Sequence, residues 1–501
     1  MKSNRMTSPS ASTPPLLART RRGFLTSSAS GLGAAAVGAL LQSDGLLAAA
    51  PTQVEPPLPI NALTPRQPHF SPRAKSCIFV YAAGGPSQLD LFDPKPELVA
   101  RNGEQLPESI TQNARFAFIQ KTAKLLGSRR TFSPHGQCGT ELSDLLPHLG
   151  HHADDLALVR TLNTEAFNHH PAQLMLSTGV PRFGRPSFGS WALYGLGSES
   201  QELPGYVVLS AGRGASGGST NWTNGFLPSS YQGVVFRSQG EPVLNLHAPA
   251  GITRDLQQAS LQAITRLNRR RAERFGDSEI QSRIASYELA FRMQKAAPDV
   301  LDLTDESQAT LDAYGMARPE PTDVKSAHGG GAGVYQTFSR NCLLARRLVE
   351  RGVRFVTLMH ASWDQHGKLT EELTYNARMA DQPLAALITD LKQRGLFDST
   401  LIVFAGEFGR TPLAQGGDGR DPHPGAFSAW LAGGGVRGGQ VIGRTDDFGW
   451  APVEEPVHIN DFHATLLHLL GLDHLQLTRR FGGLDVRLTN VAGRVVDKLI
   501  A

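Results

Sequence analysis

The amino-acid sequence predicts an α/β fold in which helices cover both faces of a mostly parallel central sheet. The first observation is a set of short apolar runs whose hydrophobicity is continuous rather than alternating, as expected of strands buried on both faces. These runs occupy residues 77–81, 156–159, 206–209, 354–358 and 400–404. The second observation is that helical patterns lie between the runs, at about 140–150, 172–178, 335–351, 371–395 and 460–471.

Residues 1–50 are typical of an export signal. Two adjacent arginines, Arg21 and Arg22, are followed by Phe-Leu, by a long uncharged stretch, and by small residues at 48–50 that offer a cleavage site. The arginine pair resembles the twin-arginine export signal. The alternative is a transmembrane anchor, since the stretch is about 20 residues long. Its weak hydrophobicity favours a cleaved signal, export to the periplasm or cell exterior, and no stable membrane span after cleavage.

The net charge of the chain comes entirely from this end. The 501 residues carry 49 Lys and Arg against 45 Asp and Glu, and residues 1–50 hold five of those cations and one of the anions. The remaining 451 residues therefore have 44 of each and no net charge. A surface that binds nucleic acid over a large area needs an excess of cations, so we expect no nucleic-acid partner.

The rest of the chain divides by composition. Residues 51–72 are rich in proline without a period, which predicts an extended linker. Residues 73–501 are predicted to form one α/β domain, with a charged helical excursion at about 253–330 on the flank of the sheet. Three cysteines allow at most one internal disulfide, and their spacing matches no CxxC site.

Charged and imidazole side chains lie on three successive predicted loops. The first two loops follow the predicted strands at 354–358 and 400–404, and the third comes next in the chain. These side chains are Asp364, His366, Glu407, Arg410, Asp421 and His423. In open parallel sheets, chemistry takes place beyond the carboxyl ends of the strands. Carboxylates with imidazoles bind zinc, manganese or iron, and an oxygen-rich subset suits calcium or magnesium. The simpler alternatives are a turn with a surface histidine for Asp364 and His366, and a helix C-cap or an ion pair with Glu407 for Arg410. Three successive loops with such residues favour a site.

A fourth loop carries His169 and His170 immediately before Pro171, which starts a predicted helix. Proline suits the first turn of a helix, and the amino end of a helix also stabilises anions. The alternative interpretation is a solvated histidine pair that caps the helix.

Several motifs, taken in order, resemble a known family. They are Gly84-Gly85-Pro86-Ser87 with Asp93-Pro94-Lys95-Pro96, Trp363-Asp364-Gln365-His366, the 406–412 run, and the segment from Trp430 to Val436. Over about residues 73–490 the chain resembles the bacterial domain-of-unknown-function family 1501, which is related to sulfatases and the alkaline phosphatase superfamily. The resemblance implies a sulfatase-like three-layer fold with a mostly parallel sheet, and a twin-arginine signal.

The chain also departs from the sulfatase pattern. Pro171 and Thr178-Gly179 keep the spacing of the sulfatase signature, but the position of the nucleophile falls on His169. Sulfatases end their first strand with paired metal-binding aspartates, where this chain has Gly84-Gly85. The resemblance therefore implies that one of two metal subsites is lost.

The surviving subsite is predicted from six residues. They are the metal ligands Asp364, His366 and His423 and the catalytic residues His169, Arg410 and Glu407. They would hold one divalent metal ion, with zinc, calcium and manganese not distinguished. The catalytic histidine would act as a general acid or base, the arginine would neutralise charge on the transferred group, and the glutamate would assist the metal.

Two functions follow from this prediction. The first is an exported, metal-dependent hydrolase of sulfate or phosphate esters in which water attacks directly, because the usual covalent nucleophile is absent. Its substrate would be a small anionic or glycan ester. The alternative is a non-catalytic relative that binds an anionic glycan or another ligand in the same cleft. The missing nucleophile favours the second, and the clustered ionisable groups favour the first.

Overall fold

The computed structural model describes residues 63–501, apart from 112–115, 276–277, 326–330 and positions 238, 239, 242, 244, 245, 247, 249 and 250. The predicted signal at 1–50 and residues 51–62 of the predicted linker lie outside the described residues. Within the described part, no helix is both long and apolar enough to cross a membrane.

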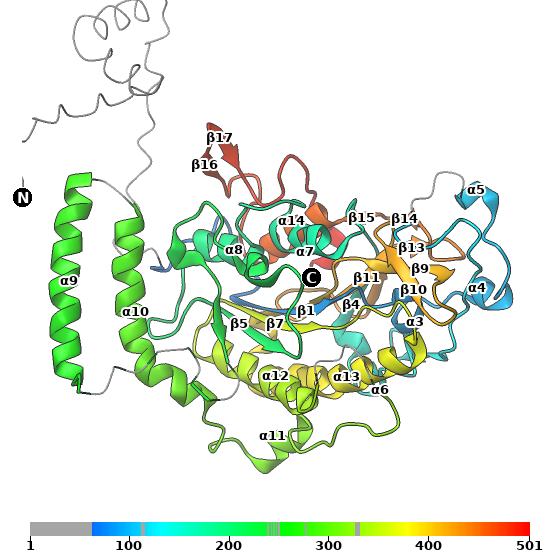
Figure 1. Ribbon diagram of the computed structural model, residues 1–501, viewed down its shortest axis with the longest axis horizontal. Helices are drawn as coiled ribbons and strands as arrows, with labels where there is room; N and C mark the ends of the chain where they lie inside the picture. Colours follow the sequence, from blue (N-terminus) through cyan, green and yellow to red (C-terminus); the bar gives the residue numbers. More distant parts are fainter. Residues whose placement is uncertain are drawn as a thin grey trace, which may run out of the picture. The chain divides into compact units, whose positions relative to one another are not determined.

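A nine-stranded sheet forms the centre of the fold (Figure 1). Its strands follow the order β12 (Gln440–Ile442), β4 (Leu156–Asn163), β11 (Phe427–Ala432), β8 (Thr400–Ala405), β1 (Ser76–Ala83), β7 (Phe355–Ala361), β5 (Tyr206–Ala211) and β6 (Val234–Phe236). The short strand β15 (Val457–His458) also pairs with β4. All pairs are parallel except those of β11, which is antiparallel to β4 and to β8. The predicted mostly parallel sheet is confirmed.

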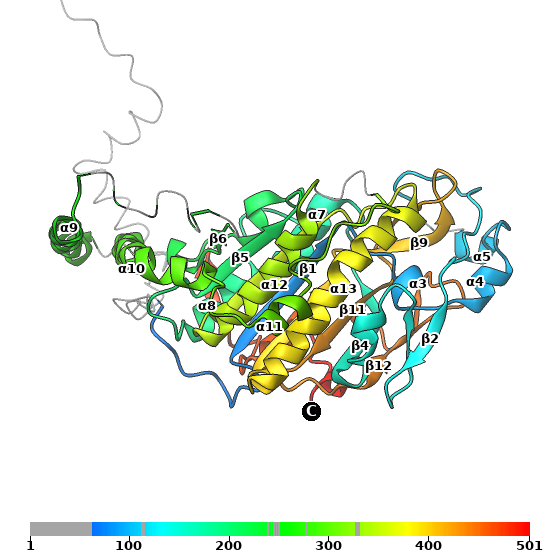
Figure 2. The ribbon, with the colours of Figure 1, turned by 90° about the horizontal axis from the view of Figure 1, so that it is seen from below.

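Helices cover both faces of the sheet (Figures 1 and 2). One face carries α12 (Val334–Glu350) and α13 (Leu369–Gln393), and the other carries α7 (His169–Thr178), α8 (Phe188–Leu196) and α14 (Ile459–Leu469). Ile78 and Val80 of β1 join the core on the first side, whereas Phe79 and Tyr81 join the core on the second. Because successive side chains of a strand point to opposite faces, a strand that is covered on both sides is apolar throughout.

The segment predicted to be helical from residue 253 contains α9 (Arg254–Phe275) and α10 (Ser278–Leu301), followed by the short α11 (Gln308–Ala313). Helix α9 packs against α10, and α10 packs against the 3-10 turn η3 (Ser229–Tyr231) and against α12.

Shorter elements complete the described part of the chain. They are α3 (Gln88–Leu91), α4 (Pro96–Ala100), α5 (Glu108–Thr111), α6 (Pro147–Gly150), β2 (Phe132–His135), β3 (Thr140–Ser143), β9 (Gly409–Ala414), β10 (Arg420–His423), β13 (Arg444–Thr445), β14 (Pro452–Glu454), β16 (Arg479–Phe481), β17 (Leu484–Val486), and the 3-10 turns η1 (Ala153–Asp155), η2 (Gly218–Trp222), η4 (Phe397–Ser399) and η5 (Asp497–Leu499).

The prediction of a helix at 140–150 is wrong. Residues 140–143 form β3, which pairs with β2 in an antiparallel hairpin, and only 147–150 are helical. Gly136 and Gly139 between the two strands have φ angles of 66° and 70°, so they supply the left-handed conformations of the turn. Pro147 then starts a single helical turn at the position where proline is tolerated.

Candidate metal centre

Four strands end at the same edge of the sheet. Strands β1, β7 and β8 are parallel neighbours, and β4 runs in the same direction because β11, between β4 and β8, is antiparallel to both. The loops after these strands therefore leave from one edge, where α/β proteins bind ligands. His169 follows β4, Asp364 and His366 follow β7, and Glu407 follows β8.

Two glycines at the end of β1 allow these loops to approach one another. Gly84 and Gly85 have φ angles of 122° and 80°. A Cβ atom on Gly84 would lie 2.8 Å from the backbone of Trp363, and one on Gly85 would lie 2.6 Å from the ring of Phe408. The Gly84 N–H donates to both carboxylate oxygens of Glu407, at 2.9 and 3.1 Å. Glycine is required here by close approach and by backbone conformation together.

Ser362 turns the chain after β7. Its φ of 98° lies in the region that favours glycine, so the backbone is strained there. The carbonyl oxygen of Ser362 accepts hydrogen bonds from the side-chain amides of Gln365 at 2.9 Å and Asn376 at 2.7 Å. These bonds hold the turn that leads into Asp364.

His169, Asp364 and His366 form a group that can hold a metal ion. Their ligand atoms all lie within 4.8 Å of one another. Oδ1 of Asp364 lies 2.8 Å from Nε2 of His366 and 3.3 Å from Nε2 of His169. The three side chains are 25% to 34% exposed, so the group is open to solvent. Catalytic metal sites have three protein ligands and an open position, whereas structural sites are closed.

Both histidines have a second acceptor that fixes the imidazole tautomer. Nδ1 of His169 lies 2.9 Å from Oε1 of Glu407, and Nδ1 of His366 lies 2.7 Å from Oε1 of Gln415. A proton held on Nδ1 leaves the lone pair on Nε2, toward Asp364. Nε2 of His169 is buried and has no hydrogen-bond partner among the described residues. Two imidazole lone pairs beside one carboxylate oxygen suit a cation, so the residues fit a metal ion.

Glu407 is itself anchored by a further residue. The buried side chain of Gln173, on α7, donates from Nε2 to Oε1 of Glu407 at 3.1 Å. Oε1 of Gln173 accepts hydrogen bonds from Ser216 at 3.0 Å and from the Gly217 N–H at 2.8 Å. Gln173 therefore connects the loop after β5 to the carboxylate that orients His169.

The carboxylates make this group attractive to positive charge. Burial opposes ionisation of Asp364, but the imidazoles of His169 and His366 beside its carboxylate and the charge of Arg410 hold the pKa of Asp364 well below its usual range. Burial likewise opposes protonation of His169, yet Asp364 and Glu407 outweigh it and raise the pKa of His169 to about 9. A cation between His169 and Asp364, whether a proton or a metal ion, is thus strongly favoured.

Arg410 lies beside this group but faces the protein. It is fully buried, and Nη2 donates to Oδ1 of Asp364 at 2.7 Å. Nε donates to the carbonyl of Gly85 at 2.9 Å and Nη1 to the carbonyl of Arg420 at 3.0 Å, while Nη2 also donates to the carbonyl of Gly84. Arg410 therefore holds Asp364 and the loop after β1 in place.

His423 is not brought to the metal group. Its Nε2 lies 2.6 Å from the carbonyl oxygen of Trp450, so this nitrogen holds a proton and offers no lone pair to a metal. The third member of the described group is His169, which the sequence predicts as a catalytic residue. The metal-ligand prediction for His423 is corrected accordingly. Sequence spacing could not separate the two histidines, because each lies in a segment that follows a strand of the central sheet, His169 after β4 and His423 after β8.

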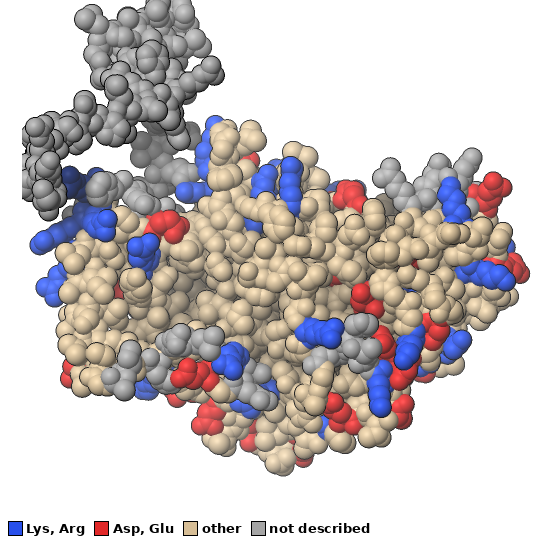
Figure 3. Space-filling view, viewed as in Figure 1, with Lys and Arg blue, Asp and Glu red and all other residues tan. Residues whose placement is uncertain are grey.

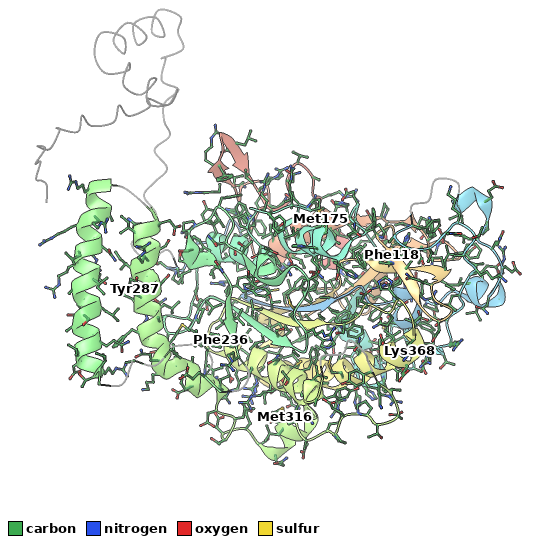
Figure 4. The ribbon with its side chains drawn as sticks, viewed as in Figure 1. Phe118, Met175, Phe236, Tyr287, Met316 and Lys368 are labelled. Carbon is green, nitrogen blue, oxygen red and sulfur yellow. The ribbon has the colours of Figure 1, made fainter. Side chains whose placement is uncertain are left out.

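Asp421 holds an aromatic side chain at the border of the group. Its buried carboxylate accepts the N–H groups of Ala117 at 2.8 Å and Phe118 at 3.1 Å. The ring of Phe118, which Figure 4 labels, lies edge-on to the ring of His366, and the two ring centroids are 5.3 Å apart. Asp421 thus supports the loop beside the group and is not one of its three members.

The sequence profile of the family described as protein of unknown function (DUF1501) matches residues 74–500. No curated protein matches the chain in sequence.

Solved structures of similar fold include three from bacteria. The lipoteichoic acid synthase LtaP of Listeria monocytogenes is 10% identical, with 86% of this chain and 78% of that chain covered and a TM-score of 0.37. The sulfatase PsFucS1 of Pseudoalteromonas sp. is 12% identical, with coverage of 84% and 72% and a TM-score of 0.37. A protein of the alkaline phosphatase superfamily from Vibrio parahaemolyticus is 9% identical, with coverage of 83% and 72% and a TM-score of 0.29. These values assign no substrate or activity to this chain.

Proposed function

The chain belongs to the DUF1501 family, and from its own site we propose that it is a metal-dependent hydrolase of sulfate or phosphate esters. The observation that carries this proposal is the tautomer arrangement of His169 and His366. Each Nδ1 has a side-chain acceptor, and each Nε2 lies beside the same oxygen of Asp364. A carboxylate or amide acceptor behind each imidazole is the outer arrangement typical of metal-binding histidines.

The ligand set favours a transition metal. Two imidazoles and one carboxylate suit zinc, manganese or iron, whereas calcium prefers six to eight oxygen ligands. We therefore propose that His169, Asp364 and His366 hold zinc or manganese rather than calcium. Such an ion supplies Lewis-acid chemistry, because it polarises an ester oxygen and makes water more acidic.

The charge of the site supports an anionic substrate. With both imidazoles neutral, Asp364 and Glu407 contribute two negative charges and Arg410 contributes one positive charge. A divalent ion changes this total from minus one to plus one. Since Asp364, His169 and His366 are partly exposed, a sulfate or phosphate group can approach from solvent and meet a net positive site.

The side chains near the group support attack by water rather than a covalent route. His169 stands at the position of the usual nucleophile but contributes to the metal group. Ser87 is buried, and its hydroxyl donates to Asp90 at 2.5 Å, within a pair that Asp90 forms with Arg420 at 2.8 Å. In this proposal Glu407 keeps the proton on Nδ1 of His169, and Arg410 keeps Asp364 ionised and in place.

The burial of Arg410 favours a second candidate function. Its donors are directed to carbonyl oxygens and to Asp364, so its guanidinium is not presented to charge that develops on a transferred group. A site that binds a sulfated or phosphorylated ligand without turnover would need no guanidinium directed at a transferred group. The second candidate function is therefore a binding site of this kind.

A substrate panel separates these functions. Purified protein loaded with zinc or manganese should release product from chromogenic sulfate or phosphate esters, and His169→Ala and Asp364→Ala should each lower kcat/KM by at least about 100-fold. His170→Ala is the matched control, because it removes the neighbouring imidazole outside the metal group. Ester binding without turnover would support the second function, and equal turnover by all variants would refute both.

A further inference from the structure

Helix α9 concentrates positive charge in a part of the chain that is neutral as a whole. Residues 254–275 carry six arginines against one aspartate and one glutamate, an excess of four cations. Cations and anions balance over residues 51–501, so the rest of that span has an excess of four anions. Five of the six arginines lie in the last ten residues of the helix, and Figure 3 shows blue side chains gathered around the end of α9 that leads into α10.

The same helix exposes an apolar strip, defined by Leu256, Ile264 and Leu267. Their exposed fractions are 51%, 41% and 61%. Spacings of eight and three residues place them on one side of an α-helix. Thr265, on the opposite side, is 8% exposed, and Leu261 on that side is partly buried. The apolar strip is therefore not the surface by which α9 packs against α10.

Three arginines continue the apolar strip toward the end of the helix. At 100° per residue, Arg270, Arg271 and Arg274 fall within about 60° of Leu267 around the axis. All three are exposed. One outward face of α9 is thus apolar in its first part and basic in its last part.

We propose that this face of α9 binds the surface of a membrane that contains anionic phospholipids. A helix with an apolar face and clustered arginines lies in the membrane interface, with its apolar side chains below the headgroups and its cations at the phosphates. A second copy packed in parallel on the same face would bring the two arginine clusters together, which like-charge repulsion disfavours, and an antiparallel copy would bury each cluster against the apolar strip of the other, which costs desolvation of the charges. The partner is therefore a lipid surface.

Vesicle flotation of the full chain tests the proposal. The protein should float with vesicles of equal parts phosphatidylcholine and phosphatidylglycerol and stay behind with pure phosphatidylcholine. Arg270→Gln/Arg271→Gln/Arg274→Gln should weaken binding to the anionic vesicles by about 100-fold, since each cation near such a surface contributes about fivefold. Ile264→Gln/Leu267→Gln should also weaken it, through the lost apolar contact.

The matched control is Leu484→Gln/Val491→Gln, which removes two apolar side chains that are 68% and 87% exposed elsewhere on the domain. This variant should bind like wild type. All variants keep residues 1–50, so any contribution of that segment is equal in each. Flotation that is unchanged in both α9 variants, or absent in wild type, overturns the proposal. A dimer in sedimentation that Leu267→Gln dissociates also overturns the proposal, because the partner on this face of α9 would then be a second copy of the chain.

Discussion

Oδ1 of Asp364 lies beside the side chains of two histidines and an arginine, which come from the start of α7, the loop after β7 and strand β9. A partly buried carboxylate beside two imidazoles and a guanidinium stays ionised, and it holds each of these groups in a fixed direction. Arg410 supplies the permanent charge, while Glu407 and Gln415 stand behind the two imidazoles. The site is therefore organised around one carboxylate oxygen.

Glu407→Gln tests whether the carboxylate behind His169 supports metal binding. An amide at this position keeps the size of the side chain but removes the charge that orients and polarises His169. We expect the affinity for zinc, measured by competition with a chromogenic chelator, to fall by about 10- to 100-fold. Glu454→Gln is the matched control, because Glu454 is an exposed glutamate on β14. Equal zinc affinity of the three proteins would show that Glu407 does not support a metal ligand.

At the residue scale, the sequence predicted which loops carry the site but not every side chain that reaches it. Asp364 and His366 lie on one short loop, so the end of β7 locates both. His169 and His423 could not be ranked, because hydrogen bonding to Trp450 withdraws His423 and only the folded chain shows this contact. The strained turn at Ser362 and the support from Gln173 left no recognisable pattern in the sequence.

At the scale of elements, continuous apolar runs located β1, β4, β5, β7 and β8 because each is covered on both faces. Strand β11 is equally buried but was recognised only as part of a family motif, and its antiparallel direction depends on pairing that one sequence does not reveal. Strand β3 was missed because Leu142 also fits a helical spacing with Leu145, Leu146 and Leu149, which follow the strand. Packing between segments that are distant in the sequence determines the direction of β11 and the formation of the hairpin of β2 and β3.

At the scale of elements, the buried His463 on α14 should make the free energy of unfolding depend on pH. It is fully buried, Nε2 donates to the carbonyl of Leu176 at 2.7 Å, and burial lowers the pKa of His463 to about 4. The unfolded chain binds this proton near pH 6.5, so the free energy of unfolding should fall as pH decreases from about 6.5 to 4, by up to about 3 kcal/mol. Urea unfolding at pH 7 and pH 5 should show a smaller difference for His463→Gln. An identical difference in both proteins would assign the pH dependence to other groups.

At the scale of the whole molecule, we propose export by the twin-arginine pathway, which rests on the sequence of residues 1–50. Arg21→Lys/Arg22→Lys should block appearance of the mature protein in the periplasmic fraction, detected by immunoblot. Arg19→Lys is the matched control, because it lies two residues before the pair. Normal export of the double variant would contradict this pathway.

The metal content of the purified protein tests the central claim most directly. After equilibration with zinc and removal of excess ion, elemental analysis should find about one ion per chain in wild type and in His423→Ala. His169→Ala and Asp364→Ala, correctly folded by circular dichroism, should retain almost none. A metal-free wild type, or loss of the ion in His423→Ala but not in His169→Ala, would contradict the assignment of His169, Asp364 and His366 as the metal centre.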